Sequence, residues 1–206
     1  MLTTERLLLR PFEESDAADL FEYLQEPMVN CFACMKIHSM EEAKAEVSKR
    51  SHDAFYFAIV QKESGKVIGE IFAHPECGHP DEPQDAPCDT YSPCWMLNKD
   101  YHGKGYGYEA AKAVVDYLFL EKGARRIYAY TEDYNIASQK VCEKLGMRRE
   151  GLFLEFISFV NDAQGNPIYE NTYQYAILKK EWESMHSPVS ARGSFPTPCI
   201  GYSQKA

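Results

Sequence analysis

A glycine-rich segment, residues 101–111, is the stretch of this chain whose spacing most directly suggests chemistry. Its sequence, YHGKGYGYEAA, places Gly103, Gly105 and Gly107 at alternate positions, and a helical pattern begins near Gly105. A glycine turn that opens a helix leaves several backbone N–H groups unpaired and pointing the same way. The helix dipole adds partial positive charge at that end, which suits a phosphate or pyrophosphate. The segment therefore predicts a phosphorylated cofactor held by main-chain amides.

Two other phosphate-binding patterns fit this segment poorly. A Walker A loop needs Lys-Ser or Lys-Thr after its last glycine, and the segment has neither. A Rossmann fingerprint has the spacing G-x-G-x-x-G and an acidic residue about 20 residues further on, whereas the spacing here is G-x-G-x-G. A nucleotide-dependent oxidoreductase stays a weak alternative, and a tight turn without any ligand is the simplest one.

The elements that must position this turn follow from the hydrophobic pattern. Helices are expected after Glu14, Ser39, Gly105 and Asn135, where Ser39 with Glu42 forms a capping box and the Asn135 side chain can cap a helix. Strands are expected at residues 2–10, 55–61, 66–73, 94–97, 127–131, 152–160 and 169–178. Strands that alternate with helices predict an α/β sheet with helices on both faces.

Charge and composition exclude some function classes. The net charge of −9 disfavours non-specific nucleic-acid binding, which needs Lys and Arg to neutralise phosphates. The same charge is compatible with steering a cationic substrate. No run approaches the roughly 18 apolar residues of a membrane span, and no secretory signal is recognised. We therefore expect a cytoplasmic protein that binds neither nucleic acid nor membranes.

The seven cysteines are expected to be reduced thiols, because no secretory signal accompanies them. Cys31 and Cys34 have the spacing of half a zinc site. Cys77, His79 and Cys88 would have to complete it, and their spacing fits no common template. No metal is therefore expected.

The glycine-rich segment resembles the acyl-CoA-binding motif of the GCN5-related N-acetyltransferase (GNAT) family, written Arg/Gln-x-x-Gly-x-Gly/Ala. The motif aligns with residues 102–107, with His102 in place of Arg or Gln. Further segments are similar to the RimJ/RimL branch, which acetylates protein N-termini and other amines: residues 2–12, 67–71, 95–101, 135–138, 143–147, 149–151 and 175–182. The resemblance covers roughly residues 2–183 and implies the GNAT fold, a central, mixed, largely antiparallel twisted sheet of about seven strands with helices on both faces. It makes residues 1–183 the domain and residues 184–206 a C-terminal tail.

The resemblance also implies roles for individual residues. Acetyl-CoA would be the co-substrate, with Asn135 bonded to its pantetheine arm and Ser138 donating a proton to the leaving thiolate. Glu70 is the expected general base, with Glu132 and Glu155 as alternatives. Local positive charge for the CoA phosphates would come from Lys104, Lys140 and Lys144. The residues expected to bind acetyl-CoA are Trp95, Met96, Leu97, His102, Gly103, Lys104, Gly105, Tyr106, Gly107, Tyr108, Asn135, Ser138 and Lys144.

The function implied is an N-acetyltransferase that moves the acetyl group of acetyl-CoA to a primary amine by direct attack in a ternary complex. The acceptor, a protein N-terminus or a small-molecule amine, stays open, as does the choice between monomer and homodimer. The alternative is a non-catalytic acyl-CoA-binding or interaction module on the same fold.

Residues 74–92 form an insert of unusual composition. They contain four prolines, five acidic residues and no Lys or Arg, so neither a regular helix nor a central strand is expected. We hypothesise that the insert folds over the acceptor site or packs on a partner subunit. A tolerated surface loop is the alternative.

Overall fold

The strands of the protein form two sheets of five in the computed structural model, which describes residues 1–77 and 87–186. The first sheet has the order β1-β2-β3-β4-β7 and is antiparallel throughout. Its strands are β1 Leu2–Thr3, β2 Leu7–Arg10, β3 Tyr56–Gln61, β4 Val67–Phe72 and β7 Cys94–Leu97. The second sheet has the order β5-β6-β8-β10-β9, in which only β6 and β8 run parallel. Its strands are β5 Pro75–Glu76, β6 Thr90–Tyr91, β8 Arg126–Glu132, β9 Arg148–Asn161 and β10 Pro167–Leu178.

The helices begin where the capping residues predict. The Ser39 hydroxyl accepts a hydrogen bond from the Glu42 N–H (3.2 Å), and the Asn135 side chain accepts one from the Ser138 N–H (3.2 Å). The α-helices are α1 Ala17–Leu24, α2 Met40–Ser51, α3 Tyr106–Leu120, α4 Ile136–Lys144 and α5 Lys179–His186. Short 3₁₀ helices are η1 Glu14–Asp16, η2 Asn30–Met35 and η3 Lys99–Tyr101. Helix α5 extends past residue 183, the predicted end of the domain.

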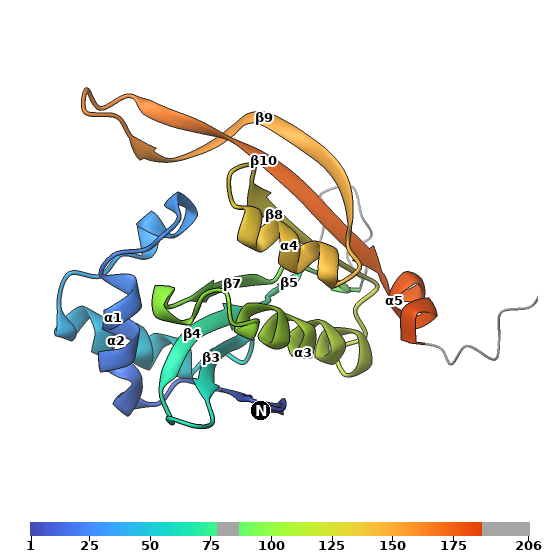
Figure 1. Cartoon of the computed structure of the whole chain (residues 1–206), viewed down its shortest axis with the longest axis horizontal. Coiled ribbons are helices and arrows are strands. Elements are labelled where there is room, and N and C mark those ends of the chain that lie inside the picture. The colour runs from blue at the N-terminus through green and yellow to red at the C-terminus, as the bar shows by residue number, and fades with distance from the viewer. Residues whose placement is uncertain (78–86, 187–206) are drawn as a thin grey trace, which may run out of the picture.

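Helices cover both faces of the first sheet, as predicted (Figure 1). Alternate residues of β3 point to opposite faces. Ile59 packs in a cluster with α3, α4 and the second sheet, while Ala58 and Val60 pack in another with α1, α2 and η2. The central strands are therefore buried on both sides, and a side chain on either face can be remote from solvent.

The number of strands differs from the expected seven or so, because two segments behave differently from their pattern. The strand expected over residues 2–10 is split into β1 and β2 by a turn. The Thr4 hydroxyl closes this turn by accepting from the Leu7 N–H (3.0 Å). Residues of the insert add β5 and β6 to the second sheet.

The insert corrects two predictions. Its residues Thr90 and Tyr91 form β6, an internal strand between β5 and β8. An internal strand is possible there because neither of these two residues is a proline. Pairing of β5 with β6 brings the two ends of the insert together, and Cys77 and Cys88 form a disulfide. These two cysteines are therefore not the reduced thiols expected, whereas Cys31, Cys34, Cys94 and Cys142 are free. His79, Cys199 and the rest of residues 78–86 and 187–206 lie outside the described part of the chain.

The two sheets separate between β7 and β8. Strand β7 is the outer strand of the first sheet, and β8 lies inside the second sheet. The long β9–β10 hairpin of the second sheet extends beyond β8 at the top of the view, and β9 contacts η2 (Figure 1). Within the described residues, no helix has the length and apolar character that a membrane crossing requires.

Candidate active site

Two cavities meet where the two sheets separate. The larger, about 630 Å³, follows β7, the glycine-rich turn and the start of α4, and reaches the end of α1. The smaller, about 220 Å³, lies between η2, the residues leading into β7, the end of β8 and the β9–β10 hairpin. The residues that line both cavities are Phe32, Trp95, Asn135 and Ser138. A ligand in the larger cavity can therefore meet a second ligand in the smaller one at this junction.

The glycine-rich turn forms one end of the larger cavity. Gly103 and Gly105 have φ of +73° and +84°, a left-handed conformation that glycine adopts without strain. Gly107 lies so near β7 that a Cβ there would be 3.3 Å from Leu97 Cδ1. All three glycines line the cavity. The first N–H groups of α3 have no acceptor within the helix, so the geometry predicted for an anion site is present.

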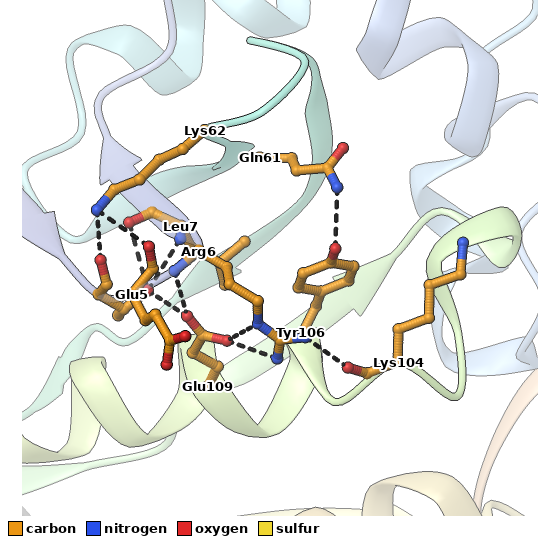
Figure 2. Close-up of polar contacts among 9 residues, drawn as sticks. Glu5, Arg6, Leu7, Gln61, Lys62, Lys104, Tyr106 and Glu109 are labelled. Carbon is orange, nitrogen blue, oxygen red and sulfur yellow. Dashed lines mark hydrogen bonds and ion pairs between the residues drawn. The ribbon is translucent and has the colours of Figure 1, made fainter.

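A network from the turn between β1 and β2 holds the glycine-rich turn in place (Figure 2). The Glu109 carboxylate accepts hydrogen bonds from the Thr4 hydroxyl (2.6 Å) and from Arg6 Nε (2.7 Å). Arg6 Nη1 donates to the Lys104 carbonyl (3.0 Å), and its guanidinium lies 4.4 Å from the centre of the Tyr106 ring. Burial raises the pKa of Glu109, but the hydrogen bonds from Thr4 and Arg6 outweigh burial and hold the pKa below its usual value. The sequence does not reveal this network, because about one hundred residues separate its two halves.

The side chains of two predicted cofactor residues lie outside the cavity. Lys104 Nζ turns back to the Asp100 carbonyl (2.9 Å), and the Tyr106 ring is buried with its hydroxyl accepting from Gln61 (2.9 Å). Neither residue lines the cavity, whereas His102 and Tyr108 do. The lysines that line it are Lys99, Lys140 and Lys144. Of the three lysines expected near the CoA phosphates, Lys140 and Lys144 therefore line the cavity and Lys104 does not.

Strand β7 presents a free backbone edge to the larger cavity. The Asn98 N–H donates to the Ile68 carbonyl (2.8 Å), and in an antiparallel ladder only alternate residues bond to the neighbouring strand. By this alternation the backbone groups of Met96 point to β4, and those of Trp95 and Leu97 point away from it. A His102 ring nitrogen lies 3.0 Å from the Leu97 carbonyl. The Trp95 and Leu97 N–H groups are therefore the donors available to a ligand along β7.

Asn135 and Ser138 lie together at the junction of the cavities. The Asn135 amide caps α4 and also donates to the Glu132 carboxylate (3.3 Å). No hydrogen bond joins the Ser138 hydroxyl to another residue in the described ranges. The hydroxyl is therefore not bonded to the helix backbone and is free to donate to a ligand. The arrangement leaves a hydroxyl donor at the junction of the two cavities.

The structure does not bring Glu70 to either cavity. Its carboxylate is fully buried, pairs with Arg50 and accepts from the hydroxyls of Tyr23 and Tyr56 (2.9 Å each). Burial raises the pKa of Glu70, and Arg50 works against that rise. Because helices cover both faces of β4, the Glu70 side chain, which the family resemblance placed in the cleft, lies instead in a buried network behind Tyr23, which lines the larger cavity.

The other two predicted carboxylates differ from each other. Glu155 is exposed with a φ of +47°, in a bulge of β9 where the pairing shifts between Glu170 and Thr172 of β10. Glu132 is buried at the end of β8 and lines the smaller cavity beside Asn135 and Ser138. Burial, and then the neighbouring Glu132 carboxylate, raise the pKa of the Cys31 thiol well above its usual value, so Cys31 stays protonated against Glu132. No cluster of residues suited to a metal ion occurs in the described ranges.

Comparison with known proteins identifies the class of this protein as an acetyltransferase. The sequence model of the acetyltransferase (GNAT) domain matches residues 6–148. The match spans more than half of the chain, so the chain belongs to the GNAT family.

Individual relatives agree with this assignment. The N-acetyltransferase YnaD of Bacillus subtilis (strain 168) is 36% identical over 182 residues, which span 88% of this chain and 98% of YnaD. The structure of a GNAT-family acetyltransferase from Bacillus anthracis is similar with a TM-score of 0.73 and 32% identity, covering 87% of this chain and 98% of that one. The ribosomal-protein-S5-alanine acetyltransferase of Vibrio fischeri shares the fold, with a TM-score of 0.64 and 22% identity over 87% of this chain and 97% of that one. The chain is thus an acyltransferase with the fold that the sequence resemblance implied.

Proposed function

We propose that the protein moves the acetyl group of acetyl-CoA to a primary amine by direct attack in a ternary complex. The observation that carries this proposal is the meeting of the two cavities at Trp95, Asn135 and Ser138. The larger cavity has a phosphate-binding turn at its far end, and the smaller one leaves room for an acceptor beside the junction. Both substrates can therefore be bound at once.

The larger cavity supplies what acetyl-CoA requires. Its pyrophosphate would bind the N–H groups of the turn from Gly103 to Tyr108, with Lys140 and Lys144 nearby. The pantetheine would lie along the free edge of β7 and bond to Trp95 and Leu97. An N–H of this edge would also stabilise the oxyanion that forms during attack, as preorganised backbone donors do in acyl transfer.

Three side chains would serve the chemistry. Asn135 would orient the pantetheine arm, and the Ser138 hydroxyl would give its proton to the leaving thiolate. A neutral amine must attack, and an amine with a pKa of roughly 8 to 10 needs a base to accept its proton at neutral pH. We assign this base to Glu132 in preference to Glu70, because Glu132 lines the acceptor side and Glu70 lines neither cavity.

The biological setting extends the proposal. We place the protein in the cytoplasm, as a monomer or homodimer that acts without a metal, nucleic acid or membrane, and treat residues 1–183 as its catalytic domain. A RimJ/RimL-like role on a protein N-terminus is supported by the shared fold and the sequence resemblance. The spermidine acetyltransferase of Vibrio cholerae has the same fold with a TM-score of 0.62, so a small amine is an equal alternative.

The test is release of free CoA from acetyl-CoA in the presence of an amine panel. The panel holds peptides with Ala, Ser or Met N-termini, spermidine, an aminoglycoside and free amino acids. We expect release that requires an amine, and a lower kcat with unchanged acetyl-CoA binding for Ser138→Ala. Ser184→Ala, an exposed serine of α5, is the matched control. Acetyl-CoA binding without transfer to any amine would favour a non-catalytic acyl-CoA-binding module.

A further inference from the structure

The smaller cavity lies at the end of β7 opposite the phosphate-binding turn. Pro93 and Cys94, at the start of the strand, line only the smaller cavity, whereas Leu97 at its other end and the glycines of the turn beyond it line only the larger one. Acetyl-CoA bound with its pyrophosphate at the turn would direct its thioester toward the smaller cavity. An acceptor held there would meet the thioester beside Ser138.

The buried carboxylates near the smaller cavity are not paired with an arginine, unlike the other buried carboxylates in the described part of the chain. Four carboxylates are buried in the described part of the chain: Asp16, Glu70, Glu132 and Glu170. Asp16 is paired with Arg10 (2.7 Å) and Glu70 with Arg50. Glu132 and Glu170 form no ion pair with any residue that the structure describes, although they are only 6% and 7% exposed. Buried charges normally have a partner of opposite sign, and of these two carboxylates Glu132 lines the smaller cavity, so this cavity is suited to a cation from outside the chain.

The existing partners of these two carboxylates are neutral. Glu132 accepts from the Asn135 amide (3.3 Å) and lies against the Cys31 thiol. Glu170 accepts from the Asn30 amide (2.5 Å) and the Tyr134 hydroxyl (3.1 Å). These bonds hold the carboxylates in position and leave their charge uncompensated.

A third polar group points independently to a ligand. Thr172 lines the cavity and is 4% exposed, and its hydroxyl has no hydrogen-bond partner in the described ranges. Thr172 pairs with Glu132 across β8 and β10 and lies two residues from Glu170, so all three share one face of the sheet. A buried hydroxyl without a partner is uncommon. A polar ligand group in the cavity would give it one.

The rest of the cavity wall is apolar and partly uncovered. It is formed by Phe32, Tyr130, Phe156, Ile157 and Phe159. The bulge of β9 sets the Phe156 ring 5.6 Å from the Tyr130 ring, yet Phe156 remains 46% exposed. The wall suits an apolar or aromatic group. A volume of about 220 Å³, below that of most drug-sized sites, admits a small acceptor or one end of a large one.

We propose that this cavity is the acceptor site and that it selects a primary ammonium flanked by a single apolar, preferably aromatic, group. The inference rests on the proposed function and adds the substrate class to it. The ammonium lies between Glu132 and the thioester, and the apolar group lies against Phe156. A small arylalkylamine and the N-terminus of a peptide with an aromatic first residue share this chemistry. A polyamine or aminoglycoside does not, because its further charges would lie on the apolar wall.

The reaction in this site has a simple balance. The ammonium gives one proton to the Glu132 carboxylate, and the nitrogen lone pair forms the new C–N bond to the acetyl carbon. The C–S bond breaks, and its electron pair remains on sulfur. The second proton that the nitrogen loses reaches the sulfur through the Ser138 hydroxyl, while Glu132 returns its proton to solvent.

The experiment compares acceptors and variants with acetyl-CoA held at saturation. The acceptors are phenethylamine, propylamine, spermidine, and peptides that differ only in Phe or Ala as first residue. We expect kcat/KM for phenethylamine to exceed that for propylamine and spermidine at least tenfold. The Phe peptide matching or exceeding phenethylamine would identify a peptide N-terminus as the source of the shared group, and its failure would identify a small amine.

The variants test the residues. Glu132→Gln should lower kcat at neutral pH by about a hundredfold or more, the usual contribution of a general base, and the loss should shrink as pH rises and more of the amine is neutral. Phe156→Ala should raise KM about tenfold for phenethylamine and leave KM for acetyl-CoA unchanged. Glu63→Gln, in the exposed turn between β3 and β4, and Leu154→Ala, which is 71% exposed on the same hairpin as Phe156, are the matched controls and should behave as the parent protein.

The outcomes separate this inference from the proposed function. Transfer that prefers spermidine, or that is unaffected by both Glu132→Gln and Phe156→Ala, would overturn the acceptor site and leave the proposed function standing. If Glu132→Gln does not fold, the Phe156→Ala result alone decides, because that half-exposed ring can be removed without opening the core. No transfer to any amine, with acetyl-CoA bound, would overturn both.

Discussion

Arg6 should control the affinity for acetyl-CoA although it lies outside the cavity. Its guanidinium joins the Glu109 carboxylate in the first turn of α3 to the Lys104 carbonyl in the glycine-rich turn (Figure 2). In Arg6→Gln the shorter, neutral side chain cannot hold both groups. The turn would then sample conformations in which its N–H groups do not converge on the pyrophosphate, and binding would have to restore the order.

The size of the effect follows from the exposure of the contacts. Arg6 has a side chain that is 42% exposed, so its ion pair with Glu109 contributes no more than about 1 kcal/mol. The hydrogen bond to the Lys104 carbonyl contributes about 1 kcal/mol net. If about half of the summed free energy of these two contacts is needed to keep the turn ordered, its loss raises the Kd for CoA about fivefold, since 1.4 kcal/mol corresponds to a factor of ten.

Isothermal titration of CoA into the parent protein and the variant measures this change directly. Arg125→Gln is the matched control, because Arg125 forms a comparably exposed pair with Asp89 (3.0 Å) and neither residue lines a cavity. Glu109→Gln should reproduce the loss, since it releases Arg6. A Kd for Arg6→Gln within twofold of the parent value, together with a lower Tm, would show that the network stabilises the fold and does not set the affinity for CoA.

Three further predictions concern stability. Gly69→Ala should destabilise the protein by about 2–3 kcal/mol, the range for overpacking, because the new Cβ would lie 2.2 Å from a backbone carbonyl of β7. Thermal denaturation measures this loss, and Gly151→Ala is the control, because the new Cβ there makes only an ordinary contact at 3.9 Å. Glu70→Gln should cost roughly 3–5 kcal/mol, because Arg50 is left buried without its partner, while the pH profile of kcat keeps its shape; an altered profile would restore Glu70 as the base. Folding lowers the pKa of Glu109. The ionised carboxylate therefore contributes to the free energy of unfolding above the pKa that Glu109 has in the unfolded chain, and this contribution is lost as pH falls through the pKa of the folded protein. The difference in urea midpoint between the parent protein and Glu109→Gln should therefore close on acidification, and a constant difference would contradict the assignment.

Local signals in the sequence predicted the parts of the site that local structure builds. Alternate glycines before a helical pattern predicted the turn at Gly103 and Gly105, because positive φ and free N–H groups are properties of the segment itself. The capping role of Asn135 was predicted from its own segment in the same way, whereas the site roles of Asn135 and Ser138 were predicted from the family resemblance. The helices on both faces of the sheet followed from hydrophobic periodicity.

Distant contacts decided what the sequence could not predict. Glu70 lies on a strand whose two faces are both covered, and nothing in residues 67–71 reveals that Arg50 of α2 reaches it. The addition of β5 and β6 to the second sheet depends on the pairing of Thr90 and Tyr91 with β8. The Cys77–Cys88 disulfide follows from the pairing of β5 with β6, and strands of two residues are too short to be recognised from periodicity.

The central claim, that this protein joins an acetyl group from acetyl-CoA to an amine at the junction of its two cavities, is tested most directly by following the label. Acetyl-CoA carrying ¹³C in its acetyl group is incubated with the protein and the preferred amine of the panel, and mass spectrometry measures both products. We predict labelled amide and free CoA in equal amounts, with both falling together in Ser138→Ala. Free CoA with labelled acetate and no amide, or no release from bound acetyl-CoA with any amine, would contradict the claim.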